Sequence, residues 1–384
     1  MKRVGYLYEK MCDIDTVKRA IRNAAKGKNN RPYIAKILGD IDYYAQEILN
    51  MLQTENVQLS PNTYQNIFDT SCMKYRLITV PRFYPDQIIH WLVVMAIQPV
   101  LERGMYRYCC GSIPNRGGID AKAFVETAIQ DGKMRYVAKL DISKFFNSVN
   151  PTTLLSMFER KIKDRKMLSL IEKVLRNGGD CLPIGYYTSQ WFSNFFLEGL
   201  DHYIKEQLHI KHYIRYMDDF ILIHHDKEYL KYCGEKIRER IQSKGLRLSP
   251  KKTQLSPFRQ PIHFLGVSFR ITETGKVIKT LLPEKISHER KKLRKLVALS
   301  LAGIIPKSHV DECYKAWKAH AEQGNSHNLI LEMDKFYKEL WRKGYAQLSQ
   351  LSKADGQGTP QDRSSQRPSD QRGVGNLDCV CHSR

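Results

Sequence analysis

The sequence has no run of about 18 apolar residues, the length that a helix needs to cross a bilayer. Its first ten residues are charged and aromatic and lack the apolar core of a secretory signal. None of its 9 cysteines is paired at zinc-site spacing, and the only clusters are Cys109-Cys110 and Cys379-Val380-Cys381-His382. There is no internal repeat. We therefore expect a cytoplasmic protein with reduced thiols and no membrane segment.

Negative charge is also scarce, since 62 Lys and Arg outnumber 40 Asp and Glu and give a net charge of +22. This balance favours a polyanionic partner, of which nucleic acid is the commonest. A merely soluble basic protein is the alternative. At 384 residues the chain is long enough to bury a large core and to form two or three subdomains.

Residues 212–223 place two adjacent carboxylates, Asp218 and Asp219, between apolar flanks. The β-branched and aromatic residues on both sides predict two strands, with the carboxylates at the tip of the hairpin. Two like charges in such a place are costly unless a cation neutralises them, and magnesium is the natural candidate. An ordinary turn is the alternative, because Asp is common in turns.

Asp141 is a third carboxylate, inside the predicted buried strand 137–142. It needs a partner, which is either an arginine, a helix amide, or the metal that Asp218 would bind. Three carboxylates on adjacent strands can hold two divalent ions, which clamp the attacking and leaving oxygens of phosphoryl transfer. Of the aromatics that follow, Phe145 and Phe146 are core residues, or one of them is the floor of a nucleotide pocket.

Two glycine-containing loops are weaker signals. Residues 110–118 form a Gly/Pro loop whose amides and Arg116 suit a phosphate, although most such loops are only turns. Gly185 precedes a long helix with an aromatic stripe, and it allows either a close approach by a ligand or a turn. Upstream, residues 75–85 predict a strand with exposed Arg76 and Arg82.

These motifs resemble those of the reverse transcriptase family over about residues 70–275. The most specific is Tyr216-Met217-Asp218-Asp219. The others, in chain order, resemble the family's first carboxylate strand, its template and nucleotide pocket, its lysine-bearing motif and its primer grip; they are residues 140–146, 182–185, 245–252 and 263–266.

The resemblance implies an α+β fold, a right-hand polymerase with fingers and palm (an antiparallel sheet plus helices) followed by a helical thumb. We expect a helical N-terminal extension over 1–70, fingers and palm over 71–275, and the thumb over 276–346. Residues 347–384 are rich in Gly, Pro, Ser and Gln and should form a disordered tail.

The resemblance also implies an RNA-directed DNA polymerase that uses two Mg²⁺ ions, with Mn²⁺ as a possible substitute. Its catalytic residues would be Asp141, Asp218 and Asp219, and Ile142 would join them as a metal ligand. Residues implied to bind the nucleotide are Arg76, Arg116, Phe146, Ile184, Gly185, Gln190, Lys251 and Lys252, either lysine lying near the triphosphate. Phe146 falls where the family excludes a ribose 2′-hydroxyl. The primer grip would be Phe264, Leu265 and Gly266.

Within the family, Ile184-Gly185 followed by Ser189-Gln190 resembles the enzymes of diversity-generating retroelements, where many relatives have Gln before the glycine. Those enzymes copy a template RNA with errors at adenines, and the cDNA replaces a variable repeat (mutagenic retrohoming). Ile184 cannot give the amide hydrogen bonds of Gln, which would relax discrimination, or it is simply a packed apolar residue. The implied partners are template RNA, primer and cDNA, dNTPs and an oligomeric basic accessory variability protein, in a bacterial, phage or archaeal host.

Two other hypotheses stay open. One is a group II intron maturase-like or phage-defence reverse transcriptase. The other is a non-catalytic RNA-binding scaffold, against which the three retained carboxylates argue, because clustered acids repel a polyanion.

Overall fold

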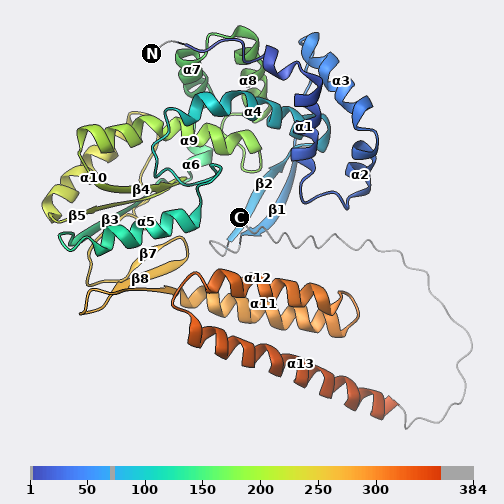
Figure 1. Ribbon diagram of the computed structural model, residues 1–384, viewed down its shortest axis with the longest axis vertical. Coiled ribbons are helices and arrows are strands. Elements are labelled where there is room, and N and C mark those ends of the chain that lie inside the picture. Colours follow the sequence, from blue (N-terminus) through green and yellow to red (C-terminus); the bar gives the residue numbers. More distant parts are fainter. Residues whose placement is uncertain (1–2, 70–73, 356–384) are drawn as a thin grey trace, which may run out of the picture. The chain divides into compact units, whose positions relative to one another are not determined.

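The computed structural model describes residues 3–69 and 74–355. The chain divides into two compact units, Met1–Gln260 and Pro261–Arg384. Figure 1 shows helices and strands in both units. The predicted mixture of helices and antiparallel sheets is confirmed.

The first unit begins with amphipathic helices. Their bounds, with a short 3₁₀ turn first, are η1 (Glu9–Met11), α1 (Ile14–Ala25), α2 (Pro32–Gly39) and α3 (Ile41–Gln53). The carboxylate of Asp13 caps α1 by accepting a hydrogen bond from the amide of Thr16 at 2.8 Å. The predicted helical region to residue 70 ends early, because Thr63–Asp69 forms strand β1, which pairs along its whole length with a second strand.

That second strand is β2 (Lys74–Val80), which carries Arg76. Both faces of this two-stranded ribbon carry exposed side chains. After β2 come η2 (Phe83–Gln87) and α4 (Ile88–Glu102), which is buried on nearly every side and packs against α8 (Arg165–Asn177) and α9 (Tyr187–His202). The aromatic stripe of α9 is part of the core, since Trp191, Phe192, Phe195 and Phe196 are buried.

A four-stranded antiparallel sheet in the order β4-β5-β3-β6 carries the predicted carboxylates. Its strands are β3 (Tyr136–Asp141), β4 (His212–Tyr216), β5 (Asp219–His224) and β6 (Gln254–Pro257). The helices not yet named in this unit are α5 (Gly118–Gln130), α6 (Phe145–Ser148), α7 (Pro151–Lys161), η3 (Tyr203–Gln207) and α10 (Lys227–Gln242). Of these, α10 packs against β3 and β5, and α5 packs against β4 (Figure 1).

Alternation along β4 separates the two faces of this sheet. Tyr213 and Arg215 reach Asp201 of α9, so Ile214 and Tyr216 point to the opposite face. Asp219 is the cross-strand partner of Tyr216 and therefore shares that opposite face. Below, the side toward α9 is called the α9 face and the other the carboxylate face.

The second unit contains a three-stranded antiparallel sheet and three helices. These are β7 (Ile262–Phe264), β8 (Val267–Ile271), β9 (Val277–Leu281), α11 (Pro283–Leu301), α12 (Lys307–Ala321) and α13 (His327–Asp355). The region predicted as a helical thumb thus begins with a strand, because Val277–Leu281 pairs with β8.

The end of the last helix also differs from expectation. Helix α13 continues to Asp355, past residue 346, where we expected the tail to begin. The rest of the predicted tail, residues 356–384, lies outside the described residues. None of the helices in the described part of the chain is long and apolar enough for a membrane span.

Candidate active site

The structure brings the three predicted carboxylates together at one end of the sheet. Asp141, the last residue of β3, is the cross-strand partner of Asp219, the first residue of β5. Asp218 lies in the tight turn before β5, and its carbonyl accepts a hydrogen bond from the amide of Ile142 at 3.2 Å. Residues far apart in sequence are therefore joined by strand pairing, as the proposed two-ion site requires.

Two lysines lie against these carboxylates. Lys252 Nζ is 2.6 Å from Asp141 Oδ2, and Lys139 Nζ is 3.5 Å from Asp219 Oδ2. Lys251 is exposed to solvent. Lys252 is exposed as well, but its contact with Asp141 makes it the one of the two alternative lysines that the fold places at the carboxylates.

Asp218 and Asp219 are held in surroundings that disfavour their charged forms. Burial raises the pKa of Asp218, and the nearby Asp141 raises it further, against lowering by Lys252 and Arg76. Burial likewise raises the pKa of Asp219 to about 6, with Lys139 opposing and Asp141 and Asp218 adding to the rise. Burial together with like charge therefore exceeds what the two lysines compensate.

This arrangement fits a divalent cation. Asp219 Oδ1 is buried and has no hydrogen-bond partner, which is costly for a carboxylate oxygen. Carboxylate oxygens are the ligands that Mg²⁺ and Mn²⁺ prefer. Across residues 3–69 and 74–355, however, no three His, Cys, Asp or Glu side chains form a ready-made ligand cluster. We infer that Asp141, Asp218 and Asp219 could hold such ions, with the backbone of Ile142 adjacent.

The predicted nucleotide pocket packs against the β1–β2 ribbon. The carbonyl of Ile184 accepts a hydrogen bond from the amide of Thr79 at 2.7 Å. Gly185 has φ +120°, and a Cβ there would lie 2.1 Å from the Thr79 carbonyl oxygen. The glycine is therefore required by the close approach of β2. Beside this loop, the amide of Leu182 donates to the carbonyl of Phe146 at 3.1 Å, so the structure joins Phe146 to the pocket segment.

The predicted arginines fall in different surroundings. Arg76 is exposed on β2 and close enough to Asp218 to lower its pKa. Arg116 instead donates from Nη1 to the carbonyls of Tyr106 and Cys109, at 2.8 and 3.4 Å, and these contacts tie its loop to the preceding residues. Gln190 lies half-buried in the first turn of α9. The nucleotide-binding roles of these three residues remain predictions.

The predicted primer grip lies in the second unit. Phe264 ends β7 and is buried, and the two-residue turn to β8 is formed by Leu265 (φ 49°) and Gly266 (φ 77°). Positive φ at both central residues is typical of the tight hairpin turns that match strand twist. The hairpin explains these residues structurally, and their contact with a primer stays a prediction.

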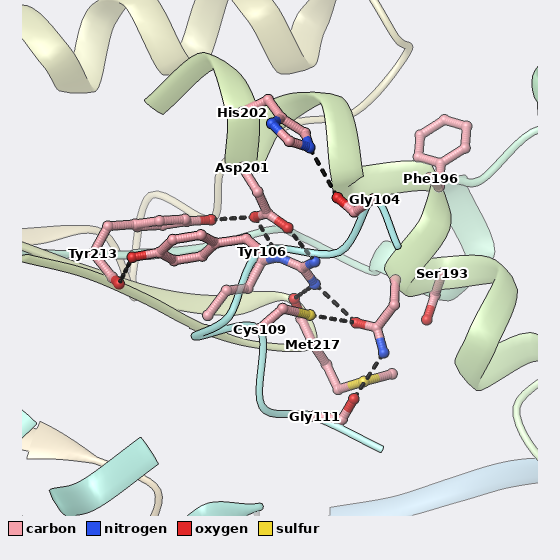
Figure 2. A network of polar contacts seen from close by, with 12 residues as sticks. Gly104, Tyr106, Cys109, Gly111, Ser193, Phe196, Asp201, His202, Tyr213 and Met217 are labelled. Carbon is pink, nitrogen blue, oxygen red and sulfur yellow. Dashed lines mark hydrogen bonds and ion pairs between the residues drawn. The ribbon is translucent and has the colours of Figure 1, made fainter. Parts of the chain in front are cut away.

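Sequence reasoning missed a buried polar network on the α9 face, directly under the Asp218 turn. Arg215 is fully buried, with Nε and Nη2 at 2.8 and 2.6 Å from the two carboxylate oxygens of Asp201. Its Nη1 donates to Asn194 Oδ1 at 2.9 Å and to the carbonyl of Met217 at 3.0 Å. Figure 2 shows Tyr213 and Asp201 at one end of these contacts and Gly111 at the other.

A signal for this network exists in the sequence. Arg215 interrupts an apolar strand, and Asn194 and Asp201 are spaced seven residues apart on one face of an aromatic helix. A buried charge in such contexts needs a partner. Lys139, also missed, is two residues from Asp141 and so shares its face of β3.

Comparison with known proteins now identifies the family. The family model for reverse transcriptase (RNA-dependent DNA polymerase) matches residues 65–269, more than half of the chain. The chain belongs to the reverse transcriptase family. The match spans the four-stranded sheet and the pocket segment, so the predicted family and its polymerase fold are confirmed.

Two curated proteins match the chain at low identity. Protein YkfC of Escherichia coli (strain K12) is 25% identical over 242 residues, which are 50% of this chain and 62% of YkfC. The group II intron-encoded protein LtrA of Lactococcus lactis subsp. cremoris is 22% identical over 305 residues, 60% of this chain and 50% of LtrA. The chain thus spans less than two thirds of either relative. A truncated apo telomerase from Candida tropicalis superposes with a TM-score of 0.42 at 16% identity, covering 60% of this chain and 58% of that chain.

Proposed function

We propose that the protein is an RNA-directed DNA polymerase. The observation that carries this proposal is the in-register pairing of Asp141 with Asp219, beside Asp218 and next to Lys252. In this account the three carboxylates hold and orient the ions, and Lys252 lies where it can neutralise charge on the triphosphate. Two divalent ions, when bound, would activate the primer 3′-hydroxyl and stabilise the charge of the leaving pyrophosphate.

The pocket residues would set which nucleotide is accepted. Phe146 and Ile184 would face the sugar and the templating base, and Arg76 would meet the triphosphate. Gly185 would keep the Ile184–Gly185 backbone close to β2, because any side chain there collides with Thr79. The pairing of Thr79 with Ile184 supports this arrangement, since it fixes the ribbon that carries Arg76 to the pocket segment.

We propose further that the enzyme copies a template RNA with errors at adenines, as in a diversity-generating retroelement. Ile184, Ser189 and Gln190 support this subfamily, because an apolar side chain replaces the amide that would hydrogen-bond to the template or nucleotide. The partners would be the template RNA, the primer and cDNA, dNTPs and an oligomeric basic accessory protein. A group II intron maturase-like activity is the second candidate, favoured by the match to LtrA.

Primer extension on an RNA template tests the activity. Asp218→Ala should lower nucleotide incorporation by at least about 10³-fold, because one carboxylate of the ion site is lost. Asp42→Ala, at an exposed residue on α3, is the control and should keep the wild-type rate. Full activity of Asp218→Ala would reject the proposal.

Sequencing of the cDNA tests the subfamily. The wild type should misincorporate mainly opposite template adenines, and Ile184→Gln should lower the frequency of these errors several-fold. Error rates equal at all four bases would reject the subfamily, and an intron RNA beside the gene would favour the maturase-like alternative. An unchanged spectrum in Ile184→Gln would make Ile184 a packing residue only.

A further inference from the structure

The turn that carries Asp218 contains a non-glycine residue with positive φ, and a side chain of the α9 face hydrogen-bonds to its backbone. Met217 has φ 57°, a left-handed conformation that costs a non-glycine residue about 1–2 kcal/mol. Arg215 Nη1 donates to the carbonyl of this residue at 3.0 Å. The strained peptide therefore has a charged donor, held in a fixed position, directly beneath it.

Arg215 is itself held rigidly. Both oxygens of Asp201 bind it, Tyr213 donates to Asp201 Oδ1 at 2.6 Å, and none of the three side chains is exposed. Such a bidentate contact fixes the plane of the guanidinium. A buried ion pair is often no more stable than apolar side chains of similar volume, so stability alone does not explain this one.

A second segment, Cys110–Gly111, packs against the Met217–Asp218 turn. Asn194 accepts from Arg215 and donates through Nδ2 to the carbonyl of Gly111 at 2.7 Å. A Cβ on Gly111 would lie 2.7 Å from the backbone nitrogen of Met217, so this residue is packed tightly against the turn (Figure 2). The neighbouring amide of Cys110 donates to the carbonyl of Arg215 at 2.9 Å.

The opposite side of the turn is fixed as well. The amide of Ile142 donates to the carbonyl of Asp218, immediately after the peptide that Arg215 holds. Two successive carbonyls, of Met217 and Asp218, are thus bound by donors on different elements. Little freedom is left in the backbone that sets the direction of the Asp218 side chain.

We propose that Arg215, with Asp201 and Asn194, is a positioning group that fixes the Met217–Asp218 turn so that the carboxylates meet their metal ions correctly. This inference rests on the proposed function. It assigns to three residues of the α9 face, none of which reaches the reacting atoms, an effect on metal affinity and on the rate of incorporation. Displacement of a reacting group by about 1 Å can cost about 10²-fold in rate.

Two matched variants on α9 test the inference in the full-length protein. Asp201→Asn removes the charge that orients Arg215. Glu198→Gln removes another buried carboxylate of the same helix, which pairs with Lys161 at 2.6 Å and does not reach the turn. Both changes nearly keep side-chain volume and each breaks one ion pair of α9, so Glu198→Gln controls for the loss of a carboxylate from this helix. The unfolding free energy of each variant is measured beside its Mn²⁺ affinity, because the pair of Arg215 is the more deeply buried one.

Mn²⁺ binding, followed by electron paramagnetic resonance, and single-turnover incorporation are measured for both variants. We expect Asp201→Asn to bind Mn²⁺ at least about tenfold more weakly and to incorporate about 10- to 100-fold more slowly, with an unchanged Kd for template–primer. Glu198→Gln should stay within twofold of the wild type in all three. Equal behaviour of the two variants would overturn the inference.

A further variant of the network, Asn194→Ala, keeps the inference testable if Asp201→Asn does not fold. Asn194→Ala keeps the Arg215–Asp201 ion pair and removes the link to Gly111, and it should also weaken Mn²⁺ binding several-fold. If neither Asp201→Asn nor Asn194→Ala folds while Glu198→Gln does, the network is a core stabiliser and the inference is wrong. An inactive wild type that still shows the expected order of Mn²⁺ affinities would reject the polymerase and leave the positioning role intact.

Discussion

The two faces of the β4-β5-β3-β6 sheet treat buried charge in opposite ways. On the α9 face, Arg215 and Asp201 are fully buried and form an ion pair in which both carboxylate oxygens accept hydrogen bonds. On the carboxylate face, Asp219 keeps an oxygen without a hydrogen bond, and the pKa values of Asp218 and Asp219 are raised. A satisfied network fixes structure, whereas acids that are only partly compensated are typical of a functional site.

The largest expected effect separates activity from stability on the carboxylate face. Asp141→Asn should lower primer extension by at least about 10³-fold while leaving thermal stability in metal-free buffer unchanged or higher, because one repelling charge is removed. Unfolding monitored by circular dichroism and a primer-extension assay check this. A clear loss of stability together with activity would show that the carboxylates are structural.

On the α9 face, removal of one charged group should lower the stability of the fold. Arg215→Met leaves Asp201 buried without its cation and should lower the free energy of unfolding by about 3–5 kcal/mol. Denaturant titration measures this loss. A cost below about 1 kcal/mol would mean that the two faces do not differ as described.

The third prediction concerns pH on the carboxylate face. The pKa of Asp219 is raised from 3.8 to about 6 by burial first, so the native state binds this proton more tightly than the unfolded chain. In metal-free buffer, the stabilisation from this group is therefore present below pH 4 and is lost as the pH rises to 6. The loss amounts to about 3 kcal/mol at most.

Comparison of the wild type with Asp219→Asn isolates this group. The difference in unfolding free energy between the two should change between pH 4 and 6 and stay constant above that range. A difference that is flat across this range would place the titration elsewhere.

The smallest expected effect concerns Lys252, whose side chain is 61% exposed although it contacts Asp141. An ion pair of this exposure contributes about 1 kcal/mol or less, so Lys252→Gln should change the free energy of unfolding by no more than that. Incorporation should nevertheless slow, because the charge near the triphosphate is lost. Lys251→Gln, at the exposed neighbour, is the control and should have a smaller effect on the rate.

The sequence predicted the carboxylates of the site better than the buried residues that hold them in place. Asp141 and Asp218 could be joined because carboxylates inside apolar strands need a shared partner, and strand pairing then supplied the contact. Arg215 and Asp201 were not paired in advance, because nothing local says that β4 and α9 lie together. The choice between Lys251 and Lys252 likewise depended on the tertiary fold.

Element boundaries were predicted less well for a related reason. The sequence predicts a helical extension where strand β1 lies, because nothing local shows the pairing of β1 with β2. The predicted helical region ends at residue 346, whereas α13 continues to Asp355, because the polar residues after 346 have the composition of the tail that follows. For Gly185 the sequence predicts close approach by a ligand or only a turn, and the structure shows that the backbone of Thr79 is the neighbour that requires glycine.

The central claim is that Asp141, Asp218 and Asp219 converge on divalent ions at the end of a growing DNA strand. Anomalous diffraction from crystals of the protein with an RNA template, a DNA primer and Mn²⁺ tests it most directly. The account predicts manganese peaks bound to carboxylate oxygens of both Asp141 and Asp218. Crystals with ordered primer and nucleotide but no manganese between these two residues would contradict it.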